Sequence, residues 1–453
     1  MSIKDLKIKS SLFAISLIIL LIFYLIPTPE GLSYSGKMMI GLMFFAIFLF
    51  VTEALPLGMS GILIMAIPPI LGIYDSREVF GFFGNEAIFL LISAFILAAG
   101  FQKSGLHKRV AVRFLRKFGK SPRIFLLGII LLGSSFSFLM SEHAVVALMI
   151  PIIAVSLAGV MEDENLRKAG MIALAYGCSV GSIGTLLGGA RNPYAVSFIS
   201  ENLGENITFL RWTEMALPVV ILMLPVVWII LIVAFPTKTE KIPVKEEIKG
   251  PVSSGEIKAG AVLISTVIAL FLFGNIGTGV IAILGATAMF LSGVIDWKDV
   301  EKAIPWGVLL LYGGAITLGK GMLGTGATGW IAQRIVSAVG NNPDILLFSV
   351  IVITVIFTEF MSNTAAVALM LPIGLGLASV SPSLNPIVIS MAIALAGGFA
   401  FTLLIGNPGN MITYSTGYYR QRDLFKVGIV ADISGILIIY FVASFVWKLM
   451  GVW

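Results

Sequence analysis

The sequence predicts an all-α polytopic membrane protein with about 11 transmembrane helices in two inverted repeats, each containing a re-entrant hairpin and an interrupted helix. Apolar residues make up 58% of the 453 residues, charged residues 12%, and the mean hydropathy is +1.02, which is more hydrocarbon than a soluble domain of this length requires. Apolar runs of about 20 residues, the length that crosses a bilayer core, recur from end to end. Residues 140–152 (MSEHAVVALMIPI) and 361–373 (MSNTAAVALMLPI) are identical at nine of thirteen positions, so the chain is an internal duplication.

The apolar runs assign the spans in chain order. Residues 1–36 hold one helix at 10–27, which we expect to be retained because no small-residue cleavage site precedes Pro27. The first repeat, 37–235, is expected to cross at 37–56, 57–73, 84–102, 168–200 and 212–235. Residues 236–257 form a polar cytoplasmic linker with mixed charges and prolines. The second repeat, 258–453, is expected to cross at 258–275, 278–294, 305–323, 384–417 and 428–450.

Two further apolar segments, 122–160 and 344–380, do not fit a single crossing. Each holds two half-length apolar runs on either side of a polar triplet. We interpret them as re-entrant hairpins, which enter the membrane and return on the same side.

The basic residues orient the chain in the cell membrane. With the N-terminus in the cytoplasm and the C-terminus outside, 23 of the 30 Lys and Arg residues fall in inner segments, as the positive-inside bias requires. Five crossings then separate the two hairpins, so the hairpins enter from opposite faces and their tips approach each other near the midplane. Because the bilayer core is about 30 Å thick, we expect Glu142 and Asn363 to lie within about 15 Å of each other.

The segment 106–120 (LHKRVAVRFLRKFGK) combines apolar residues with six Lys and Arg residues and His107. This pattern predicts an amphipathic helix at the inner membrane surface. Its charges either face water or bind anionic lipid, and the sequence does not separate these two readings.

The polar triplets mark the candidate site. Ser362, Asn363 and Thr364 precede the returning half of the second hairpin, where any of them is a suitable helix cap. A half-helix N-terminus also presents free N–H groups to an anion, and the side chains add neutral ligands for a carboxylate and hard oxygens for sodium. The recurrence of the triplet in a duplicated hairpin favours function over capping alone.

A second polar interruption follows each hairpin. In the second repeat it runs over 402–410 (TLLIGNPGN), and in the first over 183–193 (IGTLLGGARNP). Gly and Pro there interrupt a helix and free carbonyl groups, which sodium prefers as ligands. Each interruption could also be a simple kink, but two equivalent ones beside polar hairpins favour a site.

Together, the paired triplets, the Gly-Asn-Pro-Gly-Asn interruption and the Gly313-Gly314 helix resemble the divalent anion/sodium symporter family over nearly the whole chain. The resemblance implies a homodimer with a scaffold domain and a transport domain that moves like an elevator. It also implies transport of di- or tricarboxylates or sulfate, usually with sodium, and Ser-Asn-Thr triplets that bind carboxylates beside sodium sites. On this basis the substrate ligands in the second repeat are Ser362, Asn363, Thr364 and Asn410. The sodium ligands implied are Ser362, Asn363, Thr402, Gly406 and Asn407.

The first repeat departs from the family pattern. At Asn and Thr of the triplet it has Glu142 and His143 after Ser141, and its interruption carries Arg191 beside Asn192. All five residues are candidate substrate ligands. Arg191 could neutralise Glu142 or replace a sodium ion as a fixed cation that binds the anion directly. His143 could titrate and couple transport to protons. Alternatively, Glu142 and Arg191 form a structural pair that only locks the hairpin to the loop.

Three function classes remain. A carrier of dicarboxylates or similar divalent anions is favoured, coupled to sodium or protons or working by exchange, and a sodium/proton antiporter of the same superfamily is the alternative. An enzyme is not expected, because the chain lacks His-Glu-x-x-His and Gly-x-Ser-x-Gly motifs and holds only two histidines. We expect no cofactor besides sodium as a coupling ion. The expected partners are a small anion, membrane lipid and a second copy of the chain, with no nucleic acid.

Overall fold

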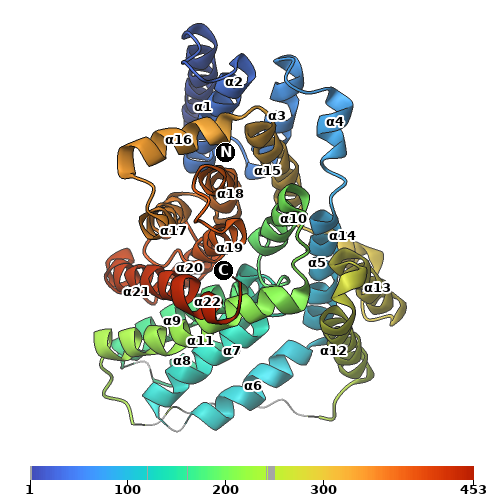
Figure 1. The fold of residues 1–453 in the computed structure, drawn as a ribbon. Coiled ribbons are helices and arrows are strands. Elements are labelled where there is room, and N and C mark those ends of the chain that lie inside the picture. Colours follow the sequence, from blue (N-terminus) through green and yellow to red (C-terminus); the bar gives the residue numbers. More distant parts are fainter. Residues whose placement is uncertain (1–2, 120, 161, 241, 243–249, 453) are drawn as a thin grey trace.

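The described chain is helical throughout. The structure is a computed structural model that describes residues 3–119, 121–160, 162–240, 242 and 250–452 (Figure 1). Within these ranges every regular element is a helix, and nine helices are long and apolar enough to cross a membrane. The predicted all-α polytopic membrane class is therefore confirmed, whereas the eleven crossings stay a prediction. Much of the predicted linker, at 241 and 243–249, lies outside the described residues.

The helices follow the predicted spans, with the interrupted ones split in two. The N-terminal helix and the elements of the first half are α1 (Ile3–Leu25), α2 (Tyr34–Thr52), α3 (Leu57–Ile70), α4 (Ser76–Gly81), α5 (Glu86–Ser104), α6 (Leu106–Phe118), α7 (Pro122–Ser137), α8 (Glu142–Ala158), α9 (Glu164–Ser182), α10 (Arg191–Leu203) and α11 (Phe209–Ala234). Those of the second half are α12 (Ser254–Phe273), η1 (Gly274–Ile276), α13 (Thr278–Leu291), α14 (Trp297–Ala303), α15 (Trp306–Gly324), α16 (Ala327–Val339), α17 (Pro343–Phe360), α18 (Asn363–Val380), α19 (Pro386–Ala396), α20 (Pro408–Tyr414), α21 (Gln421–Phe441), the π-helical η2 (Val442–Val446) and α22 (Trp447–Leu449).

Both predicted hairpins are pairs of helices joined at the polar triplet. α7 and α8 meet at Ser141, and α17 and α18 meet at Ser362, so no continuous helix passes through either triplet. α17 and α18 have 18 residues each, which at 1.5 Å per residue gives about 27 Å, close to the thickness of a bilayer core. Their length alone would permit a crossing, so the re-entrant course of this hairpin stays a prediction.

Corresponding elements of the two halves share their packing and turn geometry. α3 packs along α15, and α13 packs along α5. Gly105 ends α5 and begins α6 at φ 79°, while Gly326 ends α15 and begins α16 at φ 75°. A left-handed backbone favours glycine because glycine has no Cβ to clash. This correspondence supports the predicted duplication.

The helices after these two glycines lie at opposite ends of the molecule in Figure 1. α6 is the predicted amphipathic helix, and it buries Ala111, Val112 and Leu115. α16 is its counterpart, a helix that the sequence pattern did not predict. The only charged residue of α16 is Arg334, so it lacks the contrast between basic and apolar residues that identified α6.

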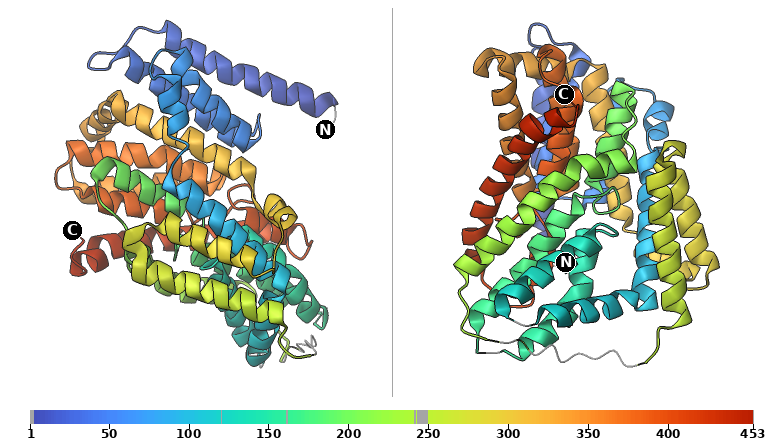
Figure 2. Two further views of the ribbon diagram at one scale, coloured as in Figure 1. Left: turned by 90° about the vertical axis from the view of Figure 1, so that its right-hand side faces the viewer. Right: turned by 60° about the horizontal axis from the view of Figure 1, so that its bottom comes forward.

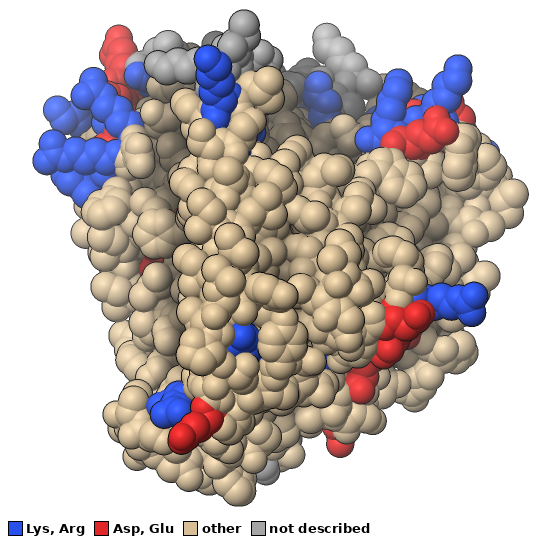
Figure 3. Space-filling view, turned by 90° about the horizontal axis from the view of Figure 1, so that it is seen from above, with Lys and Arg blue, Asp and Glu red and all other residues tan. Residues whose placement is uncertain are grey.

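The helices present a charge-poor surface over much of the molecule. α11 and α21 pack side by side next to the hairpin helices (Figure 2). In the view of Figure 3, Lys and Arg gather along one edge of the molecule, next to a broad band almost free of charge. That distribution suits a protein whose middle lies in hydrocarbon.

Candidate functional site

The two triplets form the tips of the hairpins, and we call them the first tip (Ser141, Glu142, His143) and the second tip (Ser362, Asn363, Thr364). Ser141 and Ser362 are both N-caps with nearly identical backbone angles, φ −59° and ψ 141° against φ −61° and ψ 144°. Ser362 Oγ accepts a hydrogen bond from Ala365 N at 3.3 Å, so Ser362 caps the N-terminus of α18. Ser141 Oγ instead lies 3.3 Å from His143 Nε2.

The two tips touch. Asn363 Nδ2 donates to Glu142 Oε1 at 3.0 Å, and both side chains are buried. The expectation that Glu142 and Asn363 lie within about 15 Å is therefore confirmed by direct contact. An ionised Glu at this depth needs donors to compensate its lost hydration, and Asn363 supplies one.

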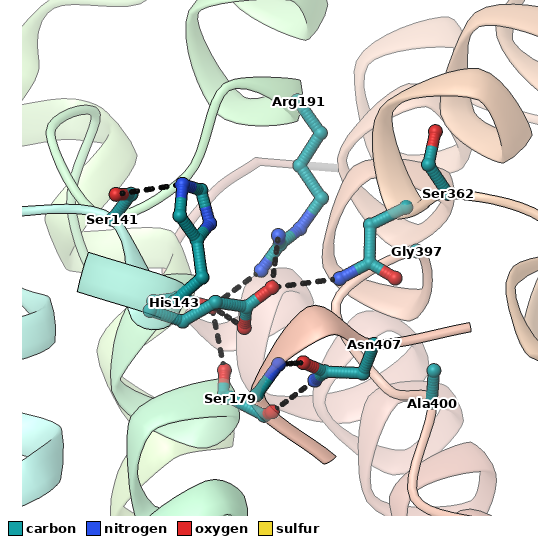
Figure 4. Close-up of polar contacts among 12 residues, drawn as sticks. Ser141, His143, Ser179, Arg191, Ser362, Gly397, Ala400 and Asn407 are labelled. Atoms are coloured by element: carbon teal, nitrogen blue, oxygen red, sulfur yellow. Dashed lines mark hydrogen bonds and ion pairs between the residues drawn. The ribbon is translucent and has the colours of Figure 1, made fainter. Parts of the chain in front are cut away.

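Arg191 is the cation of the site. Its side chain is 2% exposed and extends from the first-repeat side toward the second tip (Figure 4). Nη2 donates to Ser182 Oγ at 2.6 Å, and Ser182 Oγ lies 3.1 Å from Glu142 Oε2. Nη1 lies 3.9 Å from Glu142 Oε1, the outer limit of an ion pair, and Nε has no hydrogen-bond partner among the described residues.

A cavity of about 370 Å³ lies between the two tips, the beginnings of α3 and α15, and the middle of α5. Its wall is mostly apolar or glycine, and its polar members are Ser141, Glu142, His143, Arg191, Ser362, Asn363 and Thr364. The structure therefore brings seven of the nine predicted substrate ligands to one cavity. Pockets of roughly 300–1,000 Å³ with a few converging polar groups are typical binding sites for small molecules.

The other two predicted substrate ligands, Asn192 and Asn410, are not in this cavity wall. Each closes the interruption of its own repeat, which we call the repeat-one break (183–190) and the repeat-two break (397–407). Asn192 Nδ2 donates to the carbonyls of Ser182 and Thr185 at 2.8 and 2.7 Å. Asn410 Nδ2 donates to the carbonyls of Ala400 and Leu403 at 2.9 and 3.2 Å.

Three oxygens converge behind the second tip, and we call them the oxygen triad. Thr358 Oγ1 lies 2.6 Å from Asn363 Oδ1 and 3.2 Å from the Gly397 carbonyl. A hydroxyl has one proton and cannot satisfy both acceptors fully, whereas a cation among the three oxygens could. Neutral oxygens of this kind suit hard cations such as sodium.

The predicted sodium ligands divide between this triad and other places. Asn363 belongs to the triad, and Gly406 packs beside it, since a Cβ at Gly406 would lie 2.2 Å from the Thr358 carbonyl oxygen. Thr402 is bound by the carboxyl groups of Glu359 and Asp432. Asn407 Nδ2 donates to Ser179 Oγ across the repeats, and Ser362 Oγ caps α18.

Three residues of the site were missed by sequence reasoning: Thr358, Gly397 and Asp432. Thr358 could have been found, because the offset of 221 residues pairs it with Ser137, which is also a hydroxyl residue and is also buried. Asp432 could have been found as an acid within the predicted span 428–450, where an ionisable group is costly. Gly397 contributes a backbone carbonyl, which no residue type reveals.

The chain is similar to known membrane transporters along nearly its whole length. A family model described as "Sodium:sulfate symporter transmembrane region" matches residues 7–453. The chain is similar to the sodium-dependent dicarboxylate transporter SdcS of Staphylococcus saprophyticus, at 29% identity over 92% of this chain and 87% of that protein. SdcS of Staphylococcus aureus is 28% identical over 92% of this chain and 88% of that protein.

Among solved structures, the YdaH transporter of Alcanivorax borkumensis matches with a TM-score of 0.59 at 11% identity, over 83% of this chain and 89% of that one. MtrF of Neisseria gonorrhoeae matches with a TM-score of 0.56 at 13% identity, over 97% and 94%. At such identities the likeness concerns the fold alone. Since the family model covers nearly the whole chain, this membrane transporter belongs to the sodium:sulfate symporter family, as its resemblance to the divalent anion/sodium symporters implied.

Proposed function

We propose that this protein is a secondary active transporter of small dicarboxylates, which bind in the cavity between the two hairpin tips. The observation that carries the proposal is the guanidinium of Arg191, which is almost fully buried at the cavity wall and only partly satisfied by its neighbours. A buried cation with free donors is costly unless an anion completes it. The names of two relatives, both sodium-dependent dicarboxylate transporters, support the same substrate class.

Arg191 suits a carboxylate because its planar guanidinium offers donors in the geometry of two carboxylate oxygens. The second carboxylate of the substrate meets the second tip, where Asn363, Thr364 and the N-terminus of α18 provide neutral donors. Glu142 does not repel the substrate, because it is engaged by Asn363, Ser182 and Arg191.

The two repeats hold their cations differently. In the first repeat the guanidinium of Arg191 is built into the chain beside Ser182 and Glu142. In the second repeat the corresponding region holds the uncharged oxygen triad, which takes a sodium ion from solution. The protein therefore couples anion transport to one sodium site, in the second repeat. The built-in cation explains why Glu142 and Arg191 occur together at positions where the family has neutral sodium ligands.

Transport proceeds by an elevator-type alternation in a homodimer. The cavity lies where the tips and the repeat-one break meet α3, α5 and α15, so a shift of the tip-bearing helices against those three would carry the bound anion across. The side chains that hold the substrate come from the moving helices, whereas the facing walls from α3, α5 and α15 are apolar or glycine.

The test is uptake of radiolabelled succinate by proteoliposomes, with unlabelled succinate, citrate, 2-oxoglutarate and sulfate as competitors. We expect the dicarboxylates to compete and Arg191→Ala to abolish uptake, with Arg191→Lys recovering little because Lys lacks the planar fork. Arg211→Ala, which removes an exposed arginine of α11, is the matched control and should transport normally. Proton movement after a sodium jump without any dicarboxylate, together with absent succinate uptake, would replace the proposal by the sodium/proton antiporter.

A further inference from the structure

Two acidic side chains are buried behind the second tip. Glu359 lies near the end of α17, three residues before Ser362, and Asp432 lies in the middle of α21. Each residue is 7% exposed. The substrate site described above uses neither of them.

Both carboxyl groups hold the backbone of the repeat-two break. Glu359 accepts hydrogen bonds from the amides of Thr402 (2.8 Å) and Leu403 (2.5 Å). Asp432 accepts from the amide of Phe401 at 3.2 Å and from the hydroxyl of Thr402. The two carboxyl groups, which we call the carboxyl pair, meet at Thr402, because Glu359 accepts from its amide and Asp432 from its hydroxyl. Both oxygens of Glu359 accept hydrogen bonds from backbone amides, which is the arrangement of an ionised carboxylate, so the carboxyl pair carries negative charge.

No cation of the described chain neutralises this charge by an ion pair. α18 and α19, which pack against α17, contain no charged residue. On α11, which packs against α21, the charged residues Arg211 and Glu214 are paired with each other. Tyr176, whose hydroxyl donates to the Phe401 carbonyl, is the titratable side chain beside the carboxyl pair among the described residues.

The carboxyl pair is next to the oxygen triad. Glu359 directly follows Thr358, whose hydroxyl belongs to the triad, and the chain at Gly406 packs on both residues, with a Cβ there falling 2.9 Å from Glu359 Cα. The first repeat has no such charge, since the offset of 221 residues places Phe138 at the position of Glu359. An unneutralised negative charge is thus found beside the second tip, and a built-in cation beside the first.

We propose that Glu359 and Asp432 are positioning residues for the coupling cation: their shared negative charge draws sodium to the oxygen triad, and their hydrogen bonds fix the repeat-two break that completes it. This inference rests on the proposed function. Three uncharged oxygens bind sodium weakly by themselves, whereas a nearby negative charge in a low-dielectric interior raises the affinity strongly. The first repeat needs no equivalent pair because Arg191 replaces its ion.

The experiment compares the full-length protein with Glu359→Gln and Asp432→Asn, which remove the charge and keep the shape. Two readouts are taken: succinate uptake against sodium concentration, and the rise in melting temperature that sodium produces without any substrate. We expect each variant to raise the half-maximal sodium concentration at least tenfold, and to lose the stabilisation by sodium. Glu201→Gln, an acid-to-amide change near the end of α10, is the matched control and should keep both responses.

A third variant protects the test against misfolding. If Asp432→Asn does not yield a monodisperse protein, Thr358→Val removes a triad oxygen directly and should reproduce the sodium defect of Glu359→Gln. Folded Glu359→Gln protein with unchanged sodium dependence and unchanged stabilisation by sodium would overturn the inference. Sodium-independent succinate uptake by the unmodified protein would overturn the inference together with the proposed sodium coupling, and would leave dicarboxylate transport itself standing. If sodium stabilises the protein through Glu359 but the protein takes up no dicarboxylate, the proposed function is overturned and the role of Glu359 in sodium binding stands.

Discussion

At the scale of single residues, Asn363 is engaged at both ends of its amide. Its Nδ2 donates to Glu142 in the first tip, and its Oδ1 accepts from Thr358 in the oxygen triad. One side chain thus links the anion cavity, the opposite repeat and the candidate sodium site. Such a position tolerates neither truncation nor a change of charge.

We therefore expect Asn363→Ala and Thr364→Ala each to lower succinate uptake at least tenfold while the protein stays folded in detergent. A tenfold loss equals about 1.4 kcal/mol, which is within reach of one hydrogen bond to a charged group. The measurement is initial uptake rate against substrate concentration, with size-exclusion chromatography to check folding. Thr328→Ala, which removes a buried hydroxyl of α16 away from the cavity, is the control. Normal uptake in both tip variants would reduce the second tip to a helix cap.

At the scale of elements, each break is pressed against the last turn of its hairpin's first helix. A Cβ on Gly188 would lie 2.4 Å from the Ser137 carbonyl oxygen, and one on Gly406 would lie 2.2 Å from the Thr358 carbonyl oxygen. Ser137 and Thr358 are equivalent positions in the duplication, so both repeats use glycine for the same close approach. The obstacle is backbone in each case and cannot be relieved by turning a side chain.

Gly188→Ala and Gly406→Ala should each reduce stability by about 1–3 kcal/mol, as overpacking of a filled interior does. Gly406→Ala should also impair sodium stabilisation, since it displaces the break from the oxygen triad, whereas Gly188→Ala should not. Thermal melting with and without sodium measures both effects. Gly329→Ala in α16, where an added Cβ meets nothing within 4 Å, should be neutral or slightly stabilising. Equal melting temperatures for all three variants would contradict the close packing of the breaks.

At the scale of the whole molecule, a polar contact joins α10 to α15. Lys320 Nζ lies 2.9 Å from Glu201 Oε2 and 4.4 Å from the centre of the Phe82 ring. Glu201 also accepts a hydrogen bond from Asn85, the N-cap of α5, so it contacts both α5 and α15. If α10 moves with the tips in an elevator motion, this contact must separate in every cycle.

Linking these two positions should therefore stop transport. The double variant Glu201→Cys and Lys320→Cys is made in a Cys178→Ser background, and a short bifunctional thiol reagent joins the two new cysteines. We expect this cross-link to abolish succinate uptake while succinate still binds. Each single cysteine variant treated with the same reagent is the control and should stay active. Undiminished uptake by fully cross-linked protein would exclude a relative movement of α10 and α15.

The sequence by itself determined the fold class, both hairpins, the interruptions and the meeting of Glu142 with Asn363. These features follow from hydropathy, helix-breaking residues and an internal repeat, which are local patterns or comparisons of the chain with itself. α16 escaped prediction because Arg334 is its only charged residue, so it lacks the run of basic residues that marked α6.

Only the tertiary structure decided which polar groups act together. In the folded protein, Arg191 and Asn363 line one cavity, and Asn192 and Asn410 close the breaks. Glu359 and Asp432 both bind Thr402. The physical reason is that these partners lie on different helices, or include backbone carbonyls such as that of Gly397, and their contacts depend on how the helices are rotated against one another. Residue types show that such groups are costly in a membrane, whereas packing alone determines which partner compensates each of them.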